Sequence, residues 1–265
     1  MKVFIPSHKR PHQQTTWDNL PPAIQGITQI AVYADEASAY QNYPTILVPN
    51  EPRGIWHKRQ WLVDNCHDDR MVMIDDDLVF ATRRRDDPTK FKPSTMYEVL
   101  DMFEAIENAF EDGYIHGAVA TREGGNRFTE EFKTIGRALR FHFYNAEVLQ
   151  LEDFRFDRTT FMQDFDMTLQ LLRAGFPNVI LNKWVHNQHG SNTHGGCSTT
   201  RSAEAHAKAA HQLHDLHPDF VKVVKKKTKS AWGGGERTDV RVQWKRAFES
   251  AGNPDILDRG KVQGI

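Results

Sequence analysis

The segment MVMIDDDLVF, residues 71–80, places three aspartates directly after four apolar residues and before three more. The apolar residues 71–74 indicate a buried strand, and similar runs precede it at 2–6, 27–34 and 45–48. A stretch with helical spacing, RGIWHKRQWLVDNC, separates the last two of these strands. Near-continuous apolar strands that alternate with helices predict an α/β fold, with a Rossmann-like, mostly parallel central sheet and helices on both faces.

The alternation continues beyond the aspartates. The sequence predicts a helix at 94–110, a strand at 114–120, a Gly-rich loop at 121–127, a strand at 139–143, a helix from 163 that ends at Gly175, and a strand at 178–185. We expect one domain over 1–217, with a first half at 1–80 and a second half at 81–217. A basic C-terminal extension is expected over 218–265.

Composition limits the setting of the protein. The chain has 265 residues and a formal net charge of -1, and its only cysteines, Cys66 and Cys197, lie far apart. This cysteine usage does not suggest a disulfide scaffold and fits a reducing cytoplasm. A run of about 18 apolar residues is absent and the N-terminus MKVFIPSHKR has no signal-peptide core, so no membrane partner is expected. The oligomeric state stays open.

The three aspartates indicate a cation site. A buried strand delivers them to the ligand-binding edge of the sheet, where adjacent carboxylates repel one another unless a cation joins them. Mg²⁺ or Mn²⁺ that also contacts substrate phosphates fits this arrangement, whereas an acidic turn in solvent is the simpler alternative. The spacing Asp75-x-Asp77-x-Val79 also fits the nucleophile motif of haloacid-dehalogenase-type phosphatases. Several β/α units precede it here, and no downstream G-D-x-x-x-D follows, which argues against a phosphatase.

The order of segments resembles the type A fold of nucleotide-sugar glycosyltransferases. FIPSHKR at 4–10 is similar to their first strand and turn, which implies donor contacts from Pro6, Ser7 and Arg10. Arg59 stands where these enzymes carry an arginine before the Asp-x-Asp motif. MQDFDMTLQLLRAGF is similar to the E-D-x-D-L-x-x-R-x-x-x-G segment of inverting members, which implies that Asp164 is the catalytic base, although Gln163 replaces the usual acidic residue.

A narrower resemblance covers about residues 2–221. IPSHKR, IDDDL, the REGGNR loop, DFDMTLQLLRAGF and QHGSNTHGGCSTTR together resemble the TET-associated glycosyltransferases of bacteriophages. The resemblance implies a catalytic domain with its nucleotide-binding half at 1–80 and its acceptor half at 81–217, and the cytoplasm of the host as the setting if a phage encodes the chain. That family is understood to transfer a sugar from a nucleotide donor, here expected to be a UDP-sugar, onto hydroxymethylated pyrimidines such as hydroxymethylcytosine in double-stranded DNA. Contacts with the acceptor or a phosphate are then expected from Arg122, Asn126, Arg127, Ser191 and Arg201.

The resemblance also implies roles for the carboxylates. Asp77 would be the first metal ligand, Asp75 a second ligand or a ribose contact, and Asp76 a neighbour of the donor sugar. Asp164 would accept the proton of the attacking hydroxyl with inversion at the anomeric carbon. The alternative role for Asp164 is that of a carboxylate that complements the helix macrodipole, which contributes about 0.3 to 1 kcal/mol.

The loop HNQHGSNTHGGCSTTR at 186–201 leaves several interpretations open. In type A glycosyltransferases a histidine about two dozen residues after the base often completes the metal site, which favours His189. His186 and a purely hydrogen-bonding role are equally good alternatives, and His194 is a third possible ligand. His and Cys side chains at short gaps also suit zinc, but the spacing does not match a zinc finger.

The C-terminal region combines charge with aromatic residues. Between Lys222 and Arg246 there are nine lysines and arginines against two acids, together with Trp232 and Trp244. This mixture is typical of a nucleic-acid contact and equally of a solvated tail. Two further functional hypotheses stay open: a glycosyltransferase with a glycan or small-molecule acceptor, and a non-catalytic nucleic-acid-binding protein.

Overall fold

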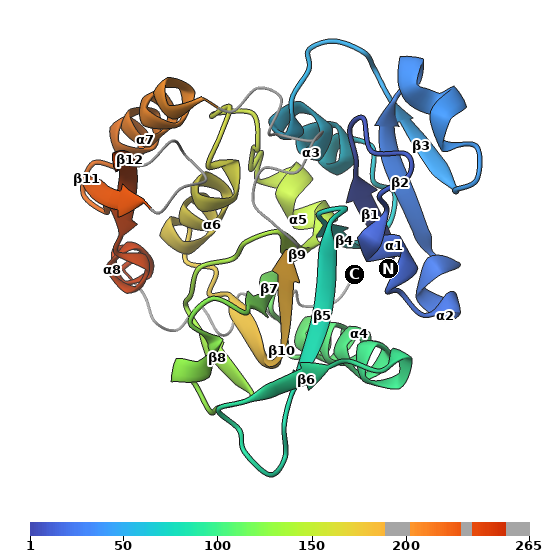
Figure 1. Cartoon of the computed structure of the whole chain (residues 1–265). Helices are drawn as coiled ribbons and strands as arrows, with labels where there is room; N and C mark the ends of the chain where they lie inside the picture. Colours follow the sequence, from blue (N-terminus) through green and yellow to red (C-terminus); the bar gives the residue numbers. More distant parts are fainter. Residues whose placement is uncertain (189–201, 229–234, 253–265) are drawn as a thin grey trace.

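One ten-stranded sheet forms the centre of the computed structural model, which describes residues 1–188, 202–228 and 235–252 (Figure 1). Its spatial order is β3-β2-β1-β4-β9-β7-β10-β5-β6, and β8 pairs with β10. The strands are β1 (Lys2–Pro6), β2 (Thr28–Tyr33), β3 (Thr45–Val48), β4 (Arg70–Ile74), β5 (Leu78–Arg83), β6 (Phe91–Pro93), β7 (His116–Thr121), β8 (Phe132–Thr134), β9 (Phe141–Asn145) and β10 (Val179–Gln188).

The direction of the strands changes at β4. On one side β3, β2, β1 and β4 are all parallel, whereas on the other side β9 runs antiparallel to both β4 and β7. β10 is parallel to β7 and antiparallel to β5 and β8. The predicted α/β fold is therefore confirmed; the part before the aspartates is parallel and the part after them is a mixed sheet, while the nucleotide-binding and acceptor roles of the two halves stay predictions. The aspartates follow β4 directly, at the junction of the two halves.

Helices cover both faces of the sheet (Figure 1). They are α1 (Thr15–Asp18), α2 (Pro22–Gln25), α3 (Ile55–Asp64), α4 (Met96–Glu111), α5 (Ala146–Leu151), α6 (Gln163–Arg173), α7 (Ala203–Leu216) and α8 (Trp244–Glu249), with short 3-10 turns η1 (Ala34–Tyr40) and η2 (Gly125–Arg127). None of these helices is long and apolar enough to cross a membrane.

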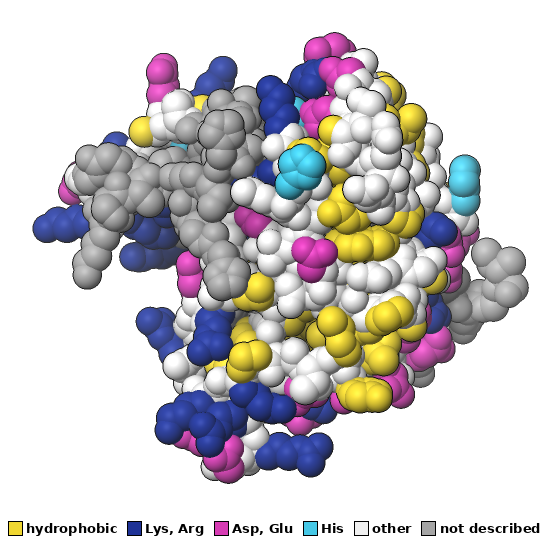
Figure 2. Space-filling view, turned by 45° about the vertical axis from the view of Figure 1, so that its right-hand side comes forward, with side chains coloured by type: hydrophobic (Ala, Val, Ile, Leu, Met, Phe, Trp, Pro, Cys, Tyr) yellow, Lys and Arg dark blue, Asp and Glu magenta, His cyan; other side chains and the backbone are white. Residues whose placement is uncertain are grey.

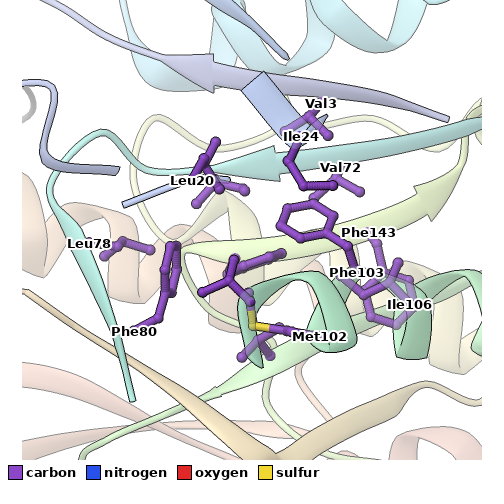
Figure 3. Packing of buried hydrophobic residues seen from close by; sticks show 14 of the residues in the cluster. Val3, Leu20, Ile24, Val72, Leu78, Phe80, Met102, Phe103, Ile106 and Phe143 are labelled. Atoms are coloured by element: carbon purple, nitrogen blue, oxygen red, sulfur yellow. The ribbon is translucent and has the colours of Figure 1, made fainter. Parts of the chain in front are cut away.

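The alternation of side chains along β4 shows how the two faces are built. Val72 and Ile74 enter a core shared with Phe103 and Ile106 of α4 (Figure 3), whereas Met71 and Met73 enter a second core with α3, α5 and α6. The side chains of these four residues are each at most 1% exposed. Because a strand buried on both faces must be apolar on both, the unbroken run MVMI follows directly from this position.

A third packed cluster joins the C-terminal region to α6. A separate antiparallel hairpin of β11 (Val221–Thr228) and β12 (Gly235–Val242) lies beside α7, and α8 packs against α6. The buried members come from all of these elements: Met162, Leu169, Leu172, Ala210, Leu213, Phe220, Val221, Val240 and Ala247. The division at residue 217 stays a prediction, and the residues on either side of it share this core.

Candidate active site

The three aspartates that follow β4 have different surroundings. Asp75 accepts a hydrogen bond of 2.8 Å from Nη2 of Arg59, and 31% of its side chain is exposed. Asp76 is buried, and both of its oxygens are used inside the protein: Nη1 of Arg10 donates to Oδ1 at 2.7 Å and Oγ of Ser7 donates to Oδ2 at 2.6 Å. Asp75 therefore faces the open side of the site, whereas the geometry of Asp76 favours a role in positioning the turn after β1.

Asp77 keeps one oxygen available for a ligand. Its Oδ2 accepts from Nη1 of Arg10 at 3.1 Å and from Nε2 of Gln188 at 2.7 Å. Its Oδ1 is buried and has no hydrogen-bond partner among residues 1–188, 202–228 and 235–252. A buried carboxylate oxygen without a partner is costly, and a divalent cation is a chemically suitable partner for it.

The residues after β1 form a turn that contacts the aspartate segment. Ser7 lies directly after Pro6, is 2% exposed, and its Oγ accepts from Nε2 of Gln14 at 2.8 Å and lies 3.1 Å from the Tyr40 hydroxyl. Nζ of Lys58 donates to the Ser7 carbonyl and lies 4.1 Å from the ring centroid of Tyr33. The turn is therefore held by side chains from η1 and α3 as well as by Asp76.

Burial and charge shift the protonation equilibria of the site. Burial raises the pKa of Asp76 to about 6, against the opposing effect of the Arg10 guanidinium. Burial also raises the pKa of Asp75; the Arg59 guanidinium opposes this effect, and the carboxylates of Asp77 and Asp164 reinforce it. The ion pairs with Asp76 and Asp77 raise the pKa of Arg10 despite its burial, so it stays charged. The negative charges of these carboxylates repel one another, and a bound cation would reduce that repulsion.

Asp164 comes to the same place from a distant part of the chain. It lies in the first turn of α6, two residues after the N-cap Met162, which has a left-handed conformation (φ 61°), and it is 8% exposed. Its charge contributes to raising the pKa of both Asp75 and the Tyr144 hydroxyl. The fold thus brings the predicted base within electrostatic range of the aspartate segment, while its catalytic role stays a prediction.

Asp166, two residues later, has a structural environment. It is fully buried, its Oδ1 lies 2.7 Å from Nε2 of His217, and its Oδ2 accepts from Nε2 of Gln170 at 3.0 Å. Since Nη1 of Arg173 can only donate to Nδ1 of His217, at 3.0 Å, the proton of the imidazole lies on Nε2 and points at Asp166. This network fixes the first turn of α6 against the end of α7.

The described residues supply some, but not all, of the expected ligands of a divalent cation. The unpartnered Oδ1 of Asp77 and the exposed carboxylate of Asp75 supply two hard oxygen ligands, which is enough for Mg²⁺ or Mn²⁺ that also contacts a diphosphate. Among residues 1–188, 202–228 and 235–252, no group of three His, Cys, Asp or Glu side chains is placed to hold a metal. His189 and His194, two of the expected third ligands, lie outside these residues.

His186 lies in the sheet and belongs to a buried group of polar rings. It is fully buried and its Nε2 donates to the Leu139 carbonyl at 3.0 Å. Neighbouring His142 and Tyr144 on β9 stack at 5.9 Å, and their ring nitrogens and hydroxyl have no hydrogen-bond partner among the described residues. Burial lowers the pKa of His186 to about 3 and that of His116 to about 4, so these imidazoles are neutral.

Three of the predicted acceptor residues, Arg122, Asn126 and Arg127, form no hydrogen bond or ion pair with the three aspartates in the described part of the chain. Arg122 follows β7 and its guanidinium lies 5.1 Å from the ring centroid of Phe91, while the side chains of Arg122, Asn126 and Arg127 are exposed. Ser191 and Arg201 lie outside the described residues. Their expected contacts with an acceptor stay predictions.

Sequence reasoning missed several supporting residues. Gln188 is the clearest example: it ends β10 opposite Leu78, the residue after Asp77, and this strand pairing brings its amide to the Asp77 carboxylate. The position of Gln188 just beyond a predicted strand was a usable signal. Gln14, Tyr40 and Lys58 gave no such signal, because their contacts with the Ser7 turn depend on the tertiary fold.

Comparisons with known proteins agree with this geometry. A family model described as TET-associated glycosyltransferase matches residues 1–196. Two curated relatives, the beta-glucosyl-HMC-alpha-glucosyl-transferases of Enterobacteria phages T6 and T2, are 25% and 24% identical, and each match covers 83% of this chain and 82% of the relative.

A solved mannosyltransferase from Pyrobaculum calidifontis, in complex with GDP-Man and Mn²⁺, superposes with a TM-score of 0.51 at 13% identity. The match covers 81% of this chain and 62% of that structure, so the chain spans less than two thirds of its length. This likeness confirms the predicted type A glycosyltransferase fold. Since the family model covers most of the sequence, the chain is a glycosyltransferase and belongs to the TET-associated glycosyltransferase family.

Proposed function

We propose that the protein transfers a sugar from a nucleotide diphosphate sugar, a UDP-sugar, to the hydroxyl of hydroxymethylated pyrimidines in double-stranded phage DNA. The observation that carries this proposal is the Oδ1 of Asp77 just after β4, which has no partner among the described residues, together with Asp164, whose charge acts on Asp75. The names of the phage relatives, which include HMC, support a modified base as the acceptor.

Metal binding and proton transfer are assigned to different residues in the proposed reaction. Asp75 and Asp77 would hold Mn²⁺ or Mg²⁺, which when bound neutralises the charge of the leaving diphosphate. Arg59 and Arg10 donate hydrogen bonds to these carboxylates and would orient them. Asp164 accepts the proton of the acceptor hydroxyl as the new bond to the anomeric carbon forms, with inversion. It lies in the first turn of α6, at the N-terminal end of that helix.

A second acceptor is favoured by one specific observation. Both relatives carry names that describe an alpha-glucosyl transfer to beta-glucosyl-HMC, in which the acceptor hydroxyl belongs to a sugar already on the base. If this chain acts in the same way from a donor of alpha configuration, the product retains configuration and Asp164 does not act as an inverting base. The anomeric configuration of the product therefore decides between the two mechanisms.

Transfer assays with two DNA acceptors test the proposal. The protein is incubated with Mn²⁺, a panel of nucleotide sugars, and duplex DNA that contains either hydroxymethylcytosine or its beta-glucosyl derivative, with unmodified DNA as the control. We expect a mass gain of one sugar on the modified nucleoside only, and NMR of the product gives its configuration. A folded protein that transfers no sugar to either modified DNA from any donor, but does transfer to a glycan or small molecule, would contradict the DNA assignment.

A further inference from the structure

The β11–β12 hairpin has two chemically different faces. Directly opposed residues of an antiparallel pair point to the same side, so the register assigns Val221, Val223 and Val240 to one face. Val221 and Val240 of this face pack with α7 and α8, and Lys225 and Lys227 lie on the same side nearer the tip of the hairpin. The other face, termed here the ribbon face, carries the pairs Lys222 with Arg241, Val224 with Asp239, and Lys226 with Arg237. Four cations and one carboxylate therefore share the outward side.

The charges on the ribbon face are only partly neutralised. Asp239 accepts from Arg237 at 2.6 Å and from Lys226 at 3.2 Å, and these contacts lower its pKa against the effect of burial. Lys222 and Arg241 are exposed and lie directly opposite each other. Like charges at directly opposed positions destabilise a hairpin, so this pair does not serve the stability of the fold. A bound polyanion would remove the repulsion.

The hairpin is fixed relative to the predicted base. Nδ1 of His214 and Nδ1 of His206, both on α7, lie 2.7 Å and 2.9 Å from the carbonyl oxygens of Val221 and Thr238. Trp244, the first residue of α8, stacks on Phe165 with ring centroids 5.6 Å apart, and Phe165 follows Asp164 in the sequence. The ring of Trp244 is therefore held against the protein, and its contact with a nucleic acid stays a prediction. Trp232 lies outside the described residues.

We infer that the ribbon face binds the phosphate backbone of the double-stranded DNA acceptor and thereby delivers the target base to Asp164. This inference rests on the proposed function and adds the surface by which the substrate is held. A two-stranded β-ribbon fits the major groove of a duplex, and lysines and arginines along it neutralise phosphates without reading sequence. In Figure 2, Lys and Arg side chains lie along the left margin of the molecule, on the side where Figure 1 shows the hairpin.

A second basic segment provides a comparison. The turn between β5 and β6 also carries lysines and arginines, seen at the bottom of Figure 2, but three of them form ion pairs with carboxylates close in sequence: Arg84 with Asp86, Lys90 with Asp87, and Lys92 with Glu98. This turn has no contact with the third core, which joins the hairpin to α6. Charge reversals there change the net charge of the protein without changing the ribbon face.

Binding to an unmodified 20-base-pair duplex, measured by fluorescence anisotropy at several salt concentrations, tests the inference. We expect the Lys222→Glu/Arg241→Glu double variant to bind at least about tenfold more weakly than the wild type. The plot of log K against log salt should also be shallower by about 2, since each lost phosphate contact contributes about 0.9. The matched control, Arg85→Glu/Lys90→Glu, changes the net charge equally and should retain most of the affinity and the slope. Melting temperatures verify that both variants are folded, and the neutral variant Lys222→Gln/Arg241→Gln should show an intermediate loss.

The result that overturns the inference is equal weakening by the ribbon and control variants, or no weakening by either. Binding of the ribbon to vesicles rich in anionic lipid, with no binding to duplex DNA, would also overturn it. Failure of the proposed function has a different signature. In that case the wild type glycosylates neither modified DNA, whereas the dependence of duplex binding on Lys222 and Arg241 can still be measured. Donor hydrolysis without DNA should be the same in the ribbon variant and the wild type.

Discussion

At the scale of single residues, the site depends on what each carboxylate can still bind. Asp76 has both oxygens occupied by Ser7 and Arg10, whereas Asp77 has one buried oxygen without a partner. Adjacent aspartates of identical chemistry are therefore separated into a positioning group and a candidate metal ligand by the residues around them. Only the environment distinguishes them.

Replacing Asp77 tests the metal site directly. Asp77→Asn should lower kcat/KM by at least about a hundredfold, because a metal at a developing charge contributes several kcal/mol and each 1.36 kcal/mol is tenfold in rate. The same variant should lose the increase in melting temperature that Mn²⁺ and a UDP-sugar together give the wild type. Asp101→Asn, an exposed change on α4, is the control and should leave both quantities unchanged. An Asp77→Asn protein with a full Mn²⁺-dependent shift would show that the ion binds elsewhere.

Replacing Asp164 separates proton transfer from donor binding. We expect Asp164→Asn to lower kcat by about 10² to 10⁴-fold, the usual contribution of a general base, because the amide cannot accept the acceptor proton. The melting shift produced by Mn²⁺ and the donor should be retained, since Asp75 and Asp77 are intact. A drop in donor affinity with unchanged kcat would instead assign Asp164 to the donor pocket.

At the scale of elements, hydrophobic patterning predicted the strands and helices that are buried on regular faces. β1, β3, β4 and α6 lie where the sequence indicates them, and α4 and β9 begin two residues later than expected. The short β5 was missed because the aspartates directly before it obscure its pattern. The sequence does not predict the hairpin, because lysines dominate β11 and hide the alternation of Val221 and Val223 with charged residues. The pattern indicates a basic tail instead.

Contacts between distant side chains lay beyond the sequence for a different reason. The bond from Gln188 to Asp77 and the pair of His217 with Asp166 each join residues separated by dozens of positions. Periodicity indicates which face of an element is buried but not which polar groups meet there. The resemblance to a family located Asp164 and the aspartates, while the residues that orient them required the structure.

The histidines of the central sheet make the stability of the fold depend on pH. His116 on β7 has a folded pKa of about 4, below the value of about 6.5 expected in the unfolded chain. A depressed folded value means that the unfolded state binds more protons between these limits, so stability is complete above pH 6.5 and falls as the pH decreases toward 4. For His116 alone the loss between pH 7 and pH 5 should be on the order of 2 kcal/mol.

Urea denaturation at pH 7 and pH 5 measures this effect. The difference in unfolding free energy between the two pH values should be smaller in His116→Phe than in the wild type by roughly the amount given above. His211→Phe, on the exposed side of α7, is the control and should keep the full difference. An identical pH dependence in His116→Phe and the wild type would show that the buried imidazole does not contribute.

At the scale of the whole molecule, the question is whether the C-terminal region folds with the catalytic part. Phe220 lies beyond the predicted boundary at residue 217 and is 6% exposed in the core that it shares with Leu169 and Leu172 of α6. Phe220→Ala should therefore lower the unfolding free energy by about 3 to 5 kcal/mol, within a single cooperative transition of the entire protein. Circular dichroism and tryptophan fluorescence followed in the same urea titration should coincide.

The matched control is the same substitution at a solvent-exposed phenylalanine. Phe132 on β8 is 60% exposed, so Phe132→Ala should change the stability by no more than about 0.5 kcal/mol. Two separated transitions in Phe220→Ala, with the sheet unaffected, would instead support an independent extension over 218–265.

The strand order also determines when the site can form during synthesis. β1 and β4 can pair as soon as residue 74 has left the ribosome, and the parallel half can then begin to fold. β5 must wait for β10, and Asp77 must wait for Gln188, which is 111 positions later in the chain. Long-range pairing of this kind is slow to form. A nascent chain therefore lacks the contact between Gln188 and Asp77 until most of the protein has been translated.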